Sequence, residues 1–306
     1  MANIQLPNII ISGATGWLGQ ELLAQIEADH SLASAYKVLA ISSNARISQT
    51  PSGRHLPTQT YENFECSGSV EGFVNLAFLT REKVNKLGHS EYVLRNLKLI
   101  SQACQVIENQ RPKWVVLVSS GAIFKNKSTE LETDISRNPY GFLKRIEELL
   151  ITDAATRVGA NVVIGRLWGA TGKYMPINRA YAISDFICQA LEGGPIQVRS
   201  GGQVFRRFCD GGEFMNVLFR LAKAGESHTL DSGGPLVEIG DLASEVASHF
   251  GGVAVLRAMS NNHSVDDYFP RSRDFDELAK HLQMEITPIS GQINLTVSGH
   301  LHLAHS

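Results

Sequence analysis

Three polar side chains near the middle of the chain, Ser120, Tyr140 and Lys144, have the types and spacing that suit proton transfer to an oxygen atom. Tyr140 and Lys144 are four residues apart, so they share one face of a helix and the ammonium comes near the phenol. A nearby cation favours the phenolate and lowers the pKa of a phenol from about 10 by roughly 1–3 units, toward values useful near neutral pH. Ser120 is able to hydrogen-bond the same reacting oxygen. The spacing therefore predicts that Lys144 activates Tyr140 for proton transfer.

A glycine-rich turn follows the first strand-like run, where residues 11–19 read ISGATGWLG. Gly13 permits a tight turn, Gly16 lets the backbone approach a pyrophosphate, and Gly19 lets the following helix pack close to the sheet. The unpaired N–H groups and the positive end of the helix dipole then bind phosphate. This pattern predicts a dinucleotide site, and its expected residues are Gly13, Thr15, Gly16, Trp17, Leu18 and Gly19.

The segment after the second strand-like run bears on the choice of cofactor. A site for NAD usually ends this strand with a carboxylate that binds the adenosine ribose, whereas a site for NADP has a cation instead. Here Val38–Ile41 is followed by SSNAR at residues 42–46, which contains no acid, and Arg46 is near enough in sequence to pair with a 2′-phosphate. The sequence therefore favours NADP, with NAD as the alternative, and adds Ser42, Ser43 and Arg46 to the expected cofactor site.

An alternation of strands and helices must position these residues, and the first two-thirds of the chain shows it. Apolar residues recur at helical spacing over residues 18–26, 93–107 and 142–150. The clearest strand-like runs are residues 8–11, 38–41, 73–78, 114–118 and 161–164. We therefore predict an α/β fold with a Rossmann-type doubly wound parallel sheet. Residues 43–72 are poorly patterned, and no third strand is placed in them.

The alternation stops after about Gly169, which predicts a change of domain. Helices joined by long loops are expected at residues 183–191, 213–224, 239–250 and 275–282. We predict a dinucleotide-binding domain over residues 1–169, to which later segments return, and a smaller C-terminal substrate-binding domain over most of residues 170–306. The terminal His300, His302 and His305 are interpreted as a frayed end rather than as a metal-binding tract.

The composition narrows the classes of function. A formal net charge of −2, with 43% hydrophobic and 19% charged residues, is typical of a globular protein without a basic field for nucleic acid. The four cysteines lack a C-x-x-C pattern, so we expect free thiols of a reducing compartment and no metal site. No leader peptide opens the chain, and no apolar run reaches the roughly 18 residues that span a bilayer. We expect a cytoplasmic protein with a small-molecule substrate and no membrane partner, and a homodimer stays open.

In their order along the chain, these motifs resemble those of the extended short-chain dehydrogenase/reductases, which include nucleotide-sugar epimerases, dehydratases and ketoreductases. The resemblance covers nearly the whole chain. It implies that Ser120, Tyr140 and Lys144 are the catalytic residues, and that Tyr140 and Lys144 also contact the cofactor. The resemblance also adds three residues to the cofactor site. Leu76 and Ala77 follow Asn75 at the end of a strand, and Asn96 lies on the next helix.

The resemblance also implies a substrate site in the second half of the chain. Residues 194–198 and the Arg206-Arg207-Phe208 segment resemble the part of the family that wraps a nucleotide and pairs its diphosphate through an arginine. The expected substrate-binding residues are Asn178, Arg206 and Arg207. Gly121 and Ala122 stand where the 4,6-dehydratases carry two acids, so the general acid and base for eliminating water are missing.

These observations predict an oxidoreductase that acts on a nucleotide-linked sugar, with an NADPH-dependent ketoreductase as the first interpretation. Tyr140 would then give a proton to the ketone oxygen while the cofactor reduces the carbon. The same three residues also serve an epimerase with a retained NAD, so they do not separate the two. A catalytically silent dinucleotide sensor is a third interpretation, and it would be expected to lack Tyr140 or Lys144, which are both present.

Overall fold

The computed structural model describes residues 6–125, 129–176, 181–258 and 265–304 of the 306-residue chain. The chain divides into two compact units. Unit 1 comprises residues 1–166 and 215–230, and unit 2 comprises residues 167–214 and 231–306.

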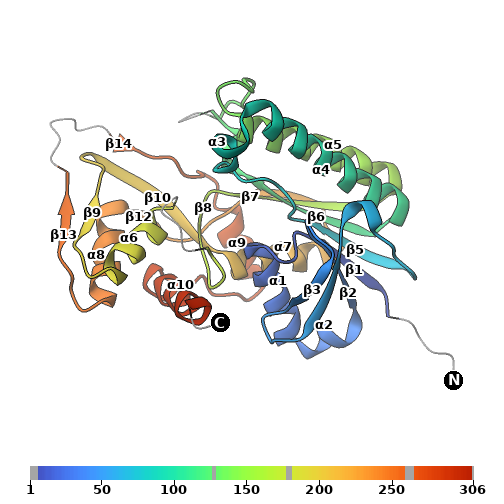
Figure 1. Ribbon diagram of the computed structural model, residues 1–306, viewed down its shortest axis with the longest axis horizontal. Coiled ribbons are helices and arrows are strands. Elements are labelled where there is room, and N and C mark those ends of the chain that lie inside the picture. Colours follow the sequence, from blue (N-terminus) through green and yellow to red (C-terminus); the bar gives the residue numbers. More distant parts are fainter. Residues whose placement is uncertain (1–5, 126–128, 177–180, 259–264, 305–306) are drawn as a thin grey trace. The chain divides into compact units, whose positions relative to one another are not determined.

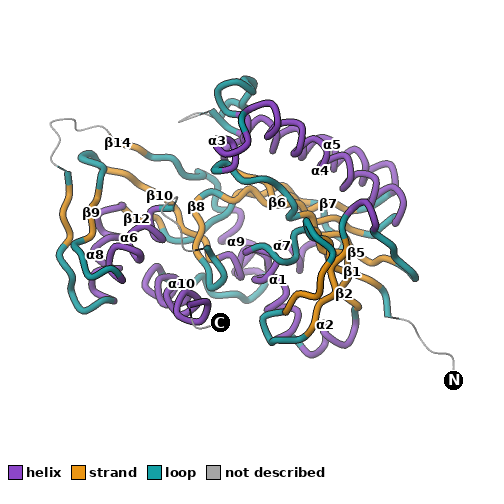
Figure 2. Tube along the Cα trace, viewed as in Figure 1, coloured by secondary structure: helices purple, strands orange, loops and turns teal. Residues whose placement is uncertain are grey.

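Unit 1 is built on a sheet of eight strands in the order β11-β7-β6-β5-β1-β2-β4-β3. Strands are orange in Figure 2. In chain order these are β1 (Asn8–Ser12), β2 (Lys37–Ile41), β3 (Arg46–Gln49), β4 (His55–Gln59), β5 (Val70–Asn75), β6 (Trp114–Ser120), β7 (Asn161–Leu167) and β11 (His228–Asp231). Strands β4, β2, β1, β5 and β6 pair in parallel, and β3 is antiparallel to β4. The predicted Rossmann-type doubly wound sheet is therefore confirmed.

Two expectations about strands need correction. The poorly patterned residues 43–72 do contain the missing strand, because β4 pairs in parallel with β2, and β3 precedes it as the first arm of a hairpin. The strand expected at residues 73–78 is β5, which begins at Val70 and ends at Asn75. The last pair of its parallel ladder with β1 is Asn75 with Ser12, and the Leu76 N–H closes this ladder by donating to the Ser12 carbonyl oxygen.

Helices cover both faces of this sheet, with α4 and α5 on one face and α1 and α2 on the other (Figure 1). The helical segments are α1 (Trp17–Ala28), α2 (His30–Ala35), α3 (Lys83–Leu87), α4 (His89–Gln110) and α5 (Pro139–Val158), with short 3-10 turns at Tyr61–Asn63 and Gly121–Ile123. Adjacent strands contribute Ile10, Phe73 and Val115 to a core that also contains Ile107 of α4 and Ile151 of α5. This apolar packing fixes α5, which carries Tyr140 and Lys144, against the sheet.

Unit 2 contains two small sheets and several helices. Its strands are β8 (Gly169–Thr171), β9 (Ile196–Val198), β10 (Gln203–Asp210), β12 (Leu236–Glu238), β13 (Val255–Arg257) and β14 (Val265–Asp266). Strand β10 pairs with β8, β12 and β14, and β9 pairs with β13. Its helices are α6 (Ala182–Leu191), α8 (Ile239–His249), α9 (Asp274–His281) and α10 (Ile289–Ala304), and α7 (Gly211–Lys223) is divided between the two units.

The interpretation of the histidine tail as a frayed end is wrong at His300. Helix α10 continues through this residue, which is only 1% exposed. The structure leaves both of its ring nitrogens without a hydrogen-bond partner, and burial lowers its pKa to about 4. His300 therefore packs as a neutral core side chain. His305 lies outside the described residues.

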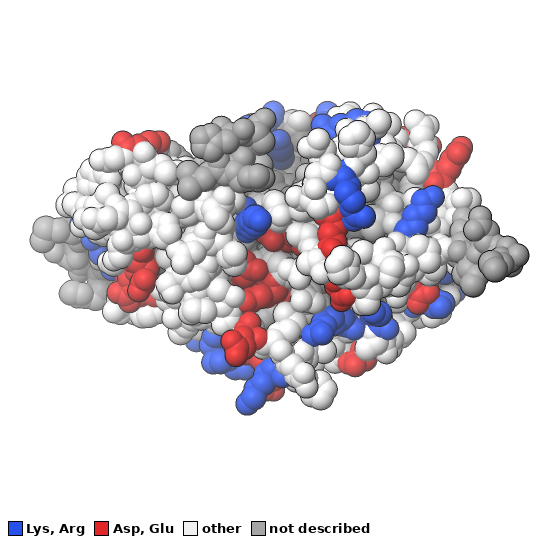
Figure 3. Space-filling model, turned by 90° about the horizontal axis from the view of Figure 1, so that it is seen from below, with Lys and Arg blue, Asp and Glu red and all other residues white. Residues whose placement is uncertain are grey.

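The surface charge and the character of the helices bear on the expectations of no basic field and of no membrane-spanning segment. On the face that Figure 3 shows, basic and acidic side chains are interspersed among uncharged ones, so neither sign dominates it. None of the helices in the described part of the chain combines the length and the apolar character needed to cross a membrane.

Candidate active site

The glycine-rich turn lies between β1 and α1, where the carboxyl ends of the central strands meet. Gly13 has a φ of +72°, and a Cβ on it would lie 2.9 Å from the Leu76 carbonyl carbon. A Cβ on Gly19 would lie 2.5 Å from the Gly13 carbonyl oxygen. Only glycine therefore allows α1 to lie this close to the turn. Helix α1 begins at Trp17 after Gly16, which has no side chain to cap it. This bare helix start fits the pyrophosphate of a dinucleotide.

The residues expected to choose the cofactor lie after β2, next to this turn. The Gly13 N–H donates to the Ile41 carbonyl oxygen at 2.8 Å, which joins the end of β2 to the turn. The Ser42 hydroxyl bonds the Thr58 hydroxyl at 3.0 Å. Ser43 is exposed, as is Arg46 at the start of β3, whose Nε contacts the Ser48 hydroxyl at 3.2 Å. The long side chain of Arg46 therefore remains accessible to an anionic ligand.

The structure brings Ser120 and Tyr140 together. Ser120 is the last residue of β6, and Tyr140 is the second residue of α5, whose first turn is capped by the Asn138 side chain at 3.0 Å from the Gly141 nitrogen. The Ser120 hydroxyl is near enough to the phenol of Tyr140 to lower its pKa. A serine and a phenol that lie near each other at the end of a parallel sheet are placed to hold one substrate oxygen between them.

The expectation that the phenol of Tyr140 has a lowered pKa is wrong. Burial raises its pKa to about 12, and the negative charges of Glu147 and Glu82 act in the same direction. The hydrogen bond from Ser120 and the charge of Arg81 lower the pKa, but they do not outweigh the burial. Tyr140 is therefore a protonated phenol at neutral pH.

The hydrogen bonds of the Lys144 ammonium go to groups other than the phenol of Tyr140. Lys144 Nζ lies 2.9 Å from the Val118 carbonyl oxygen and 2.8 Å from Glu147 Oε2, and 3.9 Å from the ring centroid of Phe78. The residue is 5% exposed. An ammonium has three N–H donors, and here a carbonyl, a carboxylate and an aromatic face surround it.

Sequence reasoning missed Glu147 and Phe78. Glu147 Oε1 accepts a hydrogen bond from the Asn75 amide at 2.8 Å, and Asn75 Oδ1 accepts from the Ser12 hydroxyl at 2.7 Å. Glu147 follows Lys144 by three residues, a spacing that brings opposite charges together on a helix, so this pair was within reach of the sequence. Nothing in the sequence pattern singles out Phe78.

Three further expected residues line the same edge of the sheet or brace it. The N–H groups of Leu76 and Ala77 lie 3.2 and 3.4 Å from the Ser12 hydroxyl. Asn96 is fully buried in α4, where its Oδ1 accepts from the Leu79 N–H at 2.8 Å. Asn96 thus holds the backbone that follows Ala77.

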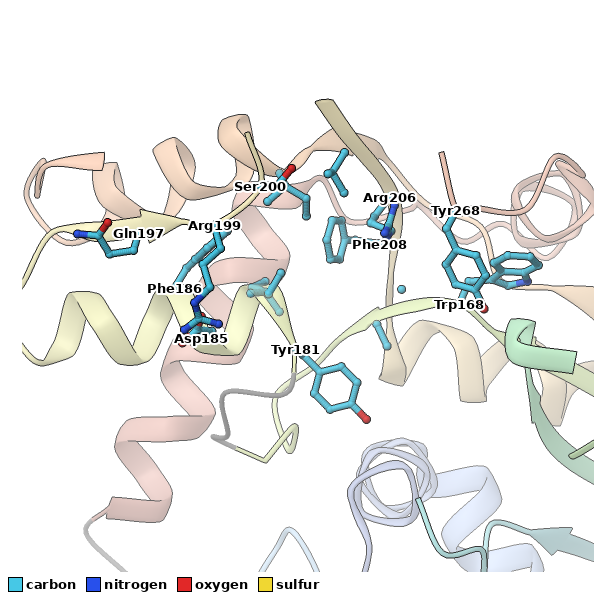
Figure 4. Close-up of a pocket in the computed structure, with 16 residues that line it drawn as sticks. Trp168, Tyr181, Asp185, Phe186, Gln197, Arg199, Ser200, Arg206, Phe208 and Tyr268 are labelled. Carbon is cyan, nitrogen blue, oxygen red and sulfur yellow. The ribbon is translucent and has the colours of Figure 1, made fainter. Parts of the chain in front are cut away.

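A pocket of about 380 Å³ lies within unit 2 and has an aromatic and cationic lining (Figure 4). The rings of Trp168 and Tyr268 lie 4.8 Å apart, and the guanidinium of Arg206 lies over Tyr268 at 5.6 Å. Arg206 also pairs with Asp266 at 2.9 Å. Figure 4 shows Arg199 beside Asp185, to which its guanidinium lies at 3.2 Å.

Only one of the two adjacent arginines lines this pocket. Successive residues of a strand point to opposite faces, and Arg207 of β10 donates to the Gly234 carbonyl oxygen at 2.8 Å. Burial lowers the pKa of Arg207, and the charge of the nearby Arg273 lowers it further. Arg206 is therefore the accessible cation of the pair. The third expected substrate residue, Asn178, lies outside the described residues.

Comparison with known proteins agrees with the glycine-rich turn and the tyrosine–lysine helix. Residues 9–232 match the model of the NAD dependent epimerase/dehydratase family. The chain belongs to this family. This epimerase/dehydratase-family chain is also similar to UDP-glucuronic acid decarboxylase 3 of Arabidopsis thaliana, with 29% identity over 114 residues. That match covers 36% of this chain, and the chain spans about a third of the length of this relative, 33%.

Solved structures show the same fold along nearly the whole chain. One is MoeE5 in complex with UDP-glucose and NAD, with 19% identity, a TM-score of 0.72, and coverage of 98% of this chain and 100% of that one. Another is the UDP-N-acetylglucosamine 4-epimerase of Methanobrevibacter ruminantium M1 in complex with UDP-N-acetylmuramic acid, with 17% identity, a TM-score of 0.76 and the same coverage. These similarities extend the epimerase/dehydratase fold to both units of this protein.

Proposed function

We propose that this epimerase/dehydratase-family protein reduces a ketone carbon of a nucleotide-linked sugar with NADPH. The observation that carries the proposal is the placement of Ser120 at the end of β6 and of Tyr140 in the first turn of α5, with the serine near enough to act on the phenol. A phenol that keeps its proton suits the reductive direction, in which the developing alkoxide needs a proton. A bound nicotinamide dinucleotide supplies the hydride.

Each residue of the site has a definite task in this proposal. Ser120 donates a hydrogen bond to the substrate carbonyl oxygen and orients it. Tyr140 gives its proton to the same oxygen as negative charge develops there. Gly13 and Gly19 allow the backbone and the start of α1 to approach the cofactor phosphates. The apolar packing under α5 keeps the phenol in place.

The pocket in unit 2 supports a nucleotide-linked substrate. Trp168 and Tyr268 offer aromatic surfaces to a base or a sugar. The guanidinium of Arg206, which pairs with Asp266, is able to bind a phosphate as well. The names of the relatives and of the solved complexes include UDP-glucuronic acid, UDP-glucose and UDP-N-acetylmuramic acid. A UDP-sugar is therefore the first class of substrate to test.

The preference for NADP rests on the end of β2. Residues 42–45 contain no acid, and Arg46 is exposed beside them. A 2′-phosphate meets no fixed negative charge from these residues and has a cation within reach. The complex of MoeE5 contains NAD, which makes NAD the alternative that any assay must include.

A second candidate is an epimerase that retains its NAD, and the epimerase among the similar solved structures favours it. A 4,6-dehydratase is not supported, because Gly121 and Ala122 provide no acid after Ser120. A homodimer and a cytoplasmic location stay predictions.

One experiment separates the reductase from the epimerase. The purified protein is denatured and the released nucleotide is identified, and the protein is then incubated with NADPH and a panel of UDP-linked ketosugars. The reductase is expected to be isolated largely without cofactor and to oxidise NADPH in proportion to the sugar reduced. Tightly bound NAD, together with interconversion of sugar epimers and no net NADPH oxidation, would favour the epimerase instead.

A further inference from the structure

A second arginine of the pocket in unit 2, Arg199, has no task in the proposed function. It directly follows β9, in which Ile196 and Val198 are buried and Gln197 is exposed. Because successive residues of a strand point to opposite sides, Arg199 lies on the side of Gln197, and both residues line the pocket. The side chain of Arg199 is 71% exposed. Its guanidinium is therefore accessible to a ligand in the pocket.

Helix α6 orients this guanidinium. Arg199 Nη2 lies 3.2 Å from the carboxylate of Asp185, whose side chain is 7% exposed. One turn further along α6, Gln189 Oε1 accepts a hydrogen bond from the Gln197 N–H at 2.6 Å, which ties α6 to β9. A guanidinium has five N–H donors, and in the described part of the chain Asp185 is the one group that pairs with Arg199. Arg199 therefore retains N–H groups for a ligand.

The lining of the pocket suggests where the parts of a nucleotide lie. Figure 4 shows Arg199 and Arg206 on different parts of the lining, with Phe208 between them in this view and Tyr268 beyond Arg206. Phe208 and Phe186, both lining residues, are each 4% exposed and offer apolar surface to a flat ring. A nucleotide sugar with its phosphate at Arg206 and its sugar toward Tyr268 has its base on the Arg199 side.

The carboxylates beside the two arginines favour different ligands. Asp185, which orients Arg199, is 7% exposed, so water screens its charge little. Asp266, which pairs with Arg206, is 44% exposed, so water screens its charge more. A phosphate at Arg199 is therefore repelled by a poorly screened carboxylate, whereas an uncharged acceptor is not. Arg199 is thus better suited to a base than to a phosphate.

The donor groups of Arg199 discriminate among nucleobases. A guanidinium donates hydrogen bonds and accepts none. Its partner on a base is therefore a carbonyl oxygen, such as O4 of uracil or thymine or O6 of guanine. Cytosine and adenine carry an amino group, which is itself a donor, at the corresponding positions.

We propose that Arg199 is a specificity-determining residue that donates to the carbonyl edge of the substrate's base, so that the pocket selects uracil, thymine or guanine over cytosine or adenine. Asp185 acts through Arg199 as a positioning residue. The proposal rests on the proposed function, because it assigns the base of the nucleotide-linked sugar.

The test is the binding of UDP, CDP and GDP to the full-length protein by calorimetric titration, with NAD and NADP in excess so that the cofactor site is filled. UDP and CDP share the ribose, the diphosphate and the pyrimidine ring, and they differ at the edge where uracil has a carbonyl and cytosine has an amino group. The parent is expected to bind UDP or GDP about 10-fold or more tightly than CDP. The tighter of these two assigns a pyrimidine or a purine base. Equal affinities for all three overturn the proposal, even if no variant folds.

Two matched variants separate the base from the phosphate. Arg199→Met removes the donors and is expected to weaken the preferred nucleotide by about 10-fold while changing CDP little. Equal weakening of both would make Arg199 a phosphate ligand and would overturn the proposal. Arg54→Met is the control, because Arg54 is 62% exposed and pairs at 2.7 Å with Glu27, which is 8% exposed, but lies in unit 1. It is expected to leave all three affinities in place, and an equal loss of preference would overturn the specific role of Arg199.

The role of Arg199 and the proposed reductase fail separately. If the preference depends on Arg199 but no nucleotide-linked ketosugar is reduced, the reductase proposal fails and the assignment of the base stands. If a CDP-linked ketosugar is reduced with the same kcat/KM as its UDP- and GDP-linked counterparts, the reductase stands and the role of Arg199 is overturned.

Discussion

Phe78 and Tyr140 meet edge to face, with ring centroids 5.8 Å apart and ring planes at 80°. The same Phe78 ring presents its face to the Lys144 ammonium at 3.9 Å. One aromatic side chain thus contacts both members of the tyrosine–lysine pair.

Tyr140→Phe removes the proton and keeps the ring that packs against Phe78. We expect kcat for ketone reduction to fall by about 10²–10⁴-fold, because general acid catalysis contributes on that order. Dinucleotide affinity, measured by fluorescence titration, is expected to stay close to that of the parent, since the glycine-rich turn is untouched. A variant that turns over at the parental rate across neutral pH would show that another group donates the proton.

Lys144→Met leaves the buried Glu147 without its cation. Breaking one side of a buried ion pair typically costs about 3–5 kcal/mol, so the free energy of unfolding in urea at pH about 7 should fall by that order. We also expect lower activity and weaker cofactor binding. The double variant Lys144→Met/Glu147→Gln should recover part of the lost stability, because it buries no unpaired charge. Additive losses would argue against a coupled buried pair.

Arg206 and Arg207 allow a test of the substrate site with adjacent residues. Arg206→Gln removes a cation from the pocket, and the loss of a charged hydrogen bond of about 1.5–3 kcal/mol raises KM for a UDP-sugar by roughly 10- to 100-fold. Arg207→Gln is expected to lower thermal stability, since Arg207 binds the Gly234 carbonyl oxygen, but to leave KM nearly unchanged. Steady-state kinetics at saturating cofactor measure both. The opposite ranking would place the phosphate site on the Arg207 side of β10.

Arg46→Ala tests the cofactor preference. If Arg46 pairs with the 2′-phosphate, its removal weakens NADP binding by about 1–3 kcal/mol and changes NAD binding little. Calorimetric titration with each cofactor gives the comparison. Equal losses for both cofactors, or no loss for either, would make Arg46 an ordinary loop-end residue and would leave NAD as the better assignment.

Protonation of Glu238 is expected to lower the stability of the folded protein in acid. Burial raises its pKa, but hydrogen bonds from Arg257 and from the N–H groups of Val204 and Gly240 outweigh this and bring the pKa to about 2. Because the folded pKa is depressed, this stabilisation is present above about pH 4.5 and is lost as the pH falls toward 2.

Glu238→Gln should therefore be less stable than the parent at pH about 7 by up to about 3 kcal/mol, and the difference should shrink as the pH falls from 4.5 to about 2. Glu245→Gln, at an exposed site of the following helix α8, is the control and should show little difference at any pH. Urea unfolding at a series of pH values measures this. A pH-independent difference would mean that the charge of Glu238 is not the cause.

Local patterns in the sequence determined the glycine-rich turn, the parallel strands and the helix that carries Tyr140 and Lys144. These features depend on spacings of a few residues, which backbone geometry converts directly into turns and faces. The same reasoning failed over residues 43–72. Strands β3 and β4 form at an edge of the sheet, where exposed polar residues weaken the alternation of apolar and polar residues that marks a strand.

Only the tertiary structure decided the electrostatic state of the site. Asn75 and Glu147 are 72 residues apart in the chain and meet at 2.8 Å, and Phe78 reaches Lys144 from a different element. The pKa of a phenol depends on burial and on every charge near it, and these are fixed by packing rather than by spacing along one helix. The helical spacing of Tyr140 and Lys144 thus placed the pair on one helix, whereas burial, with a smaller effect from the Glu147 carboxylate, raises the pKa of Tyr140.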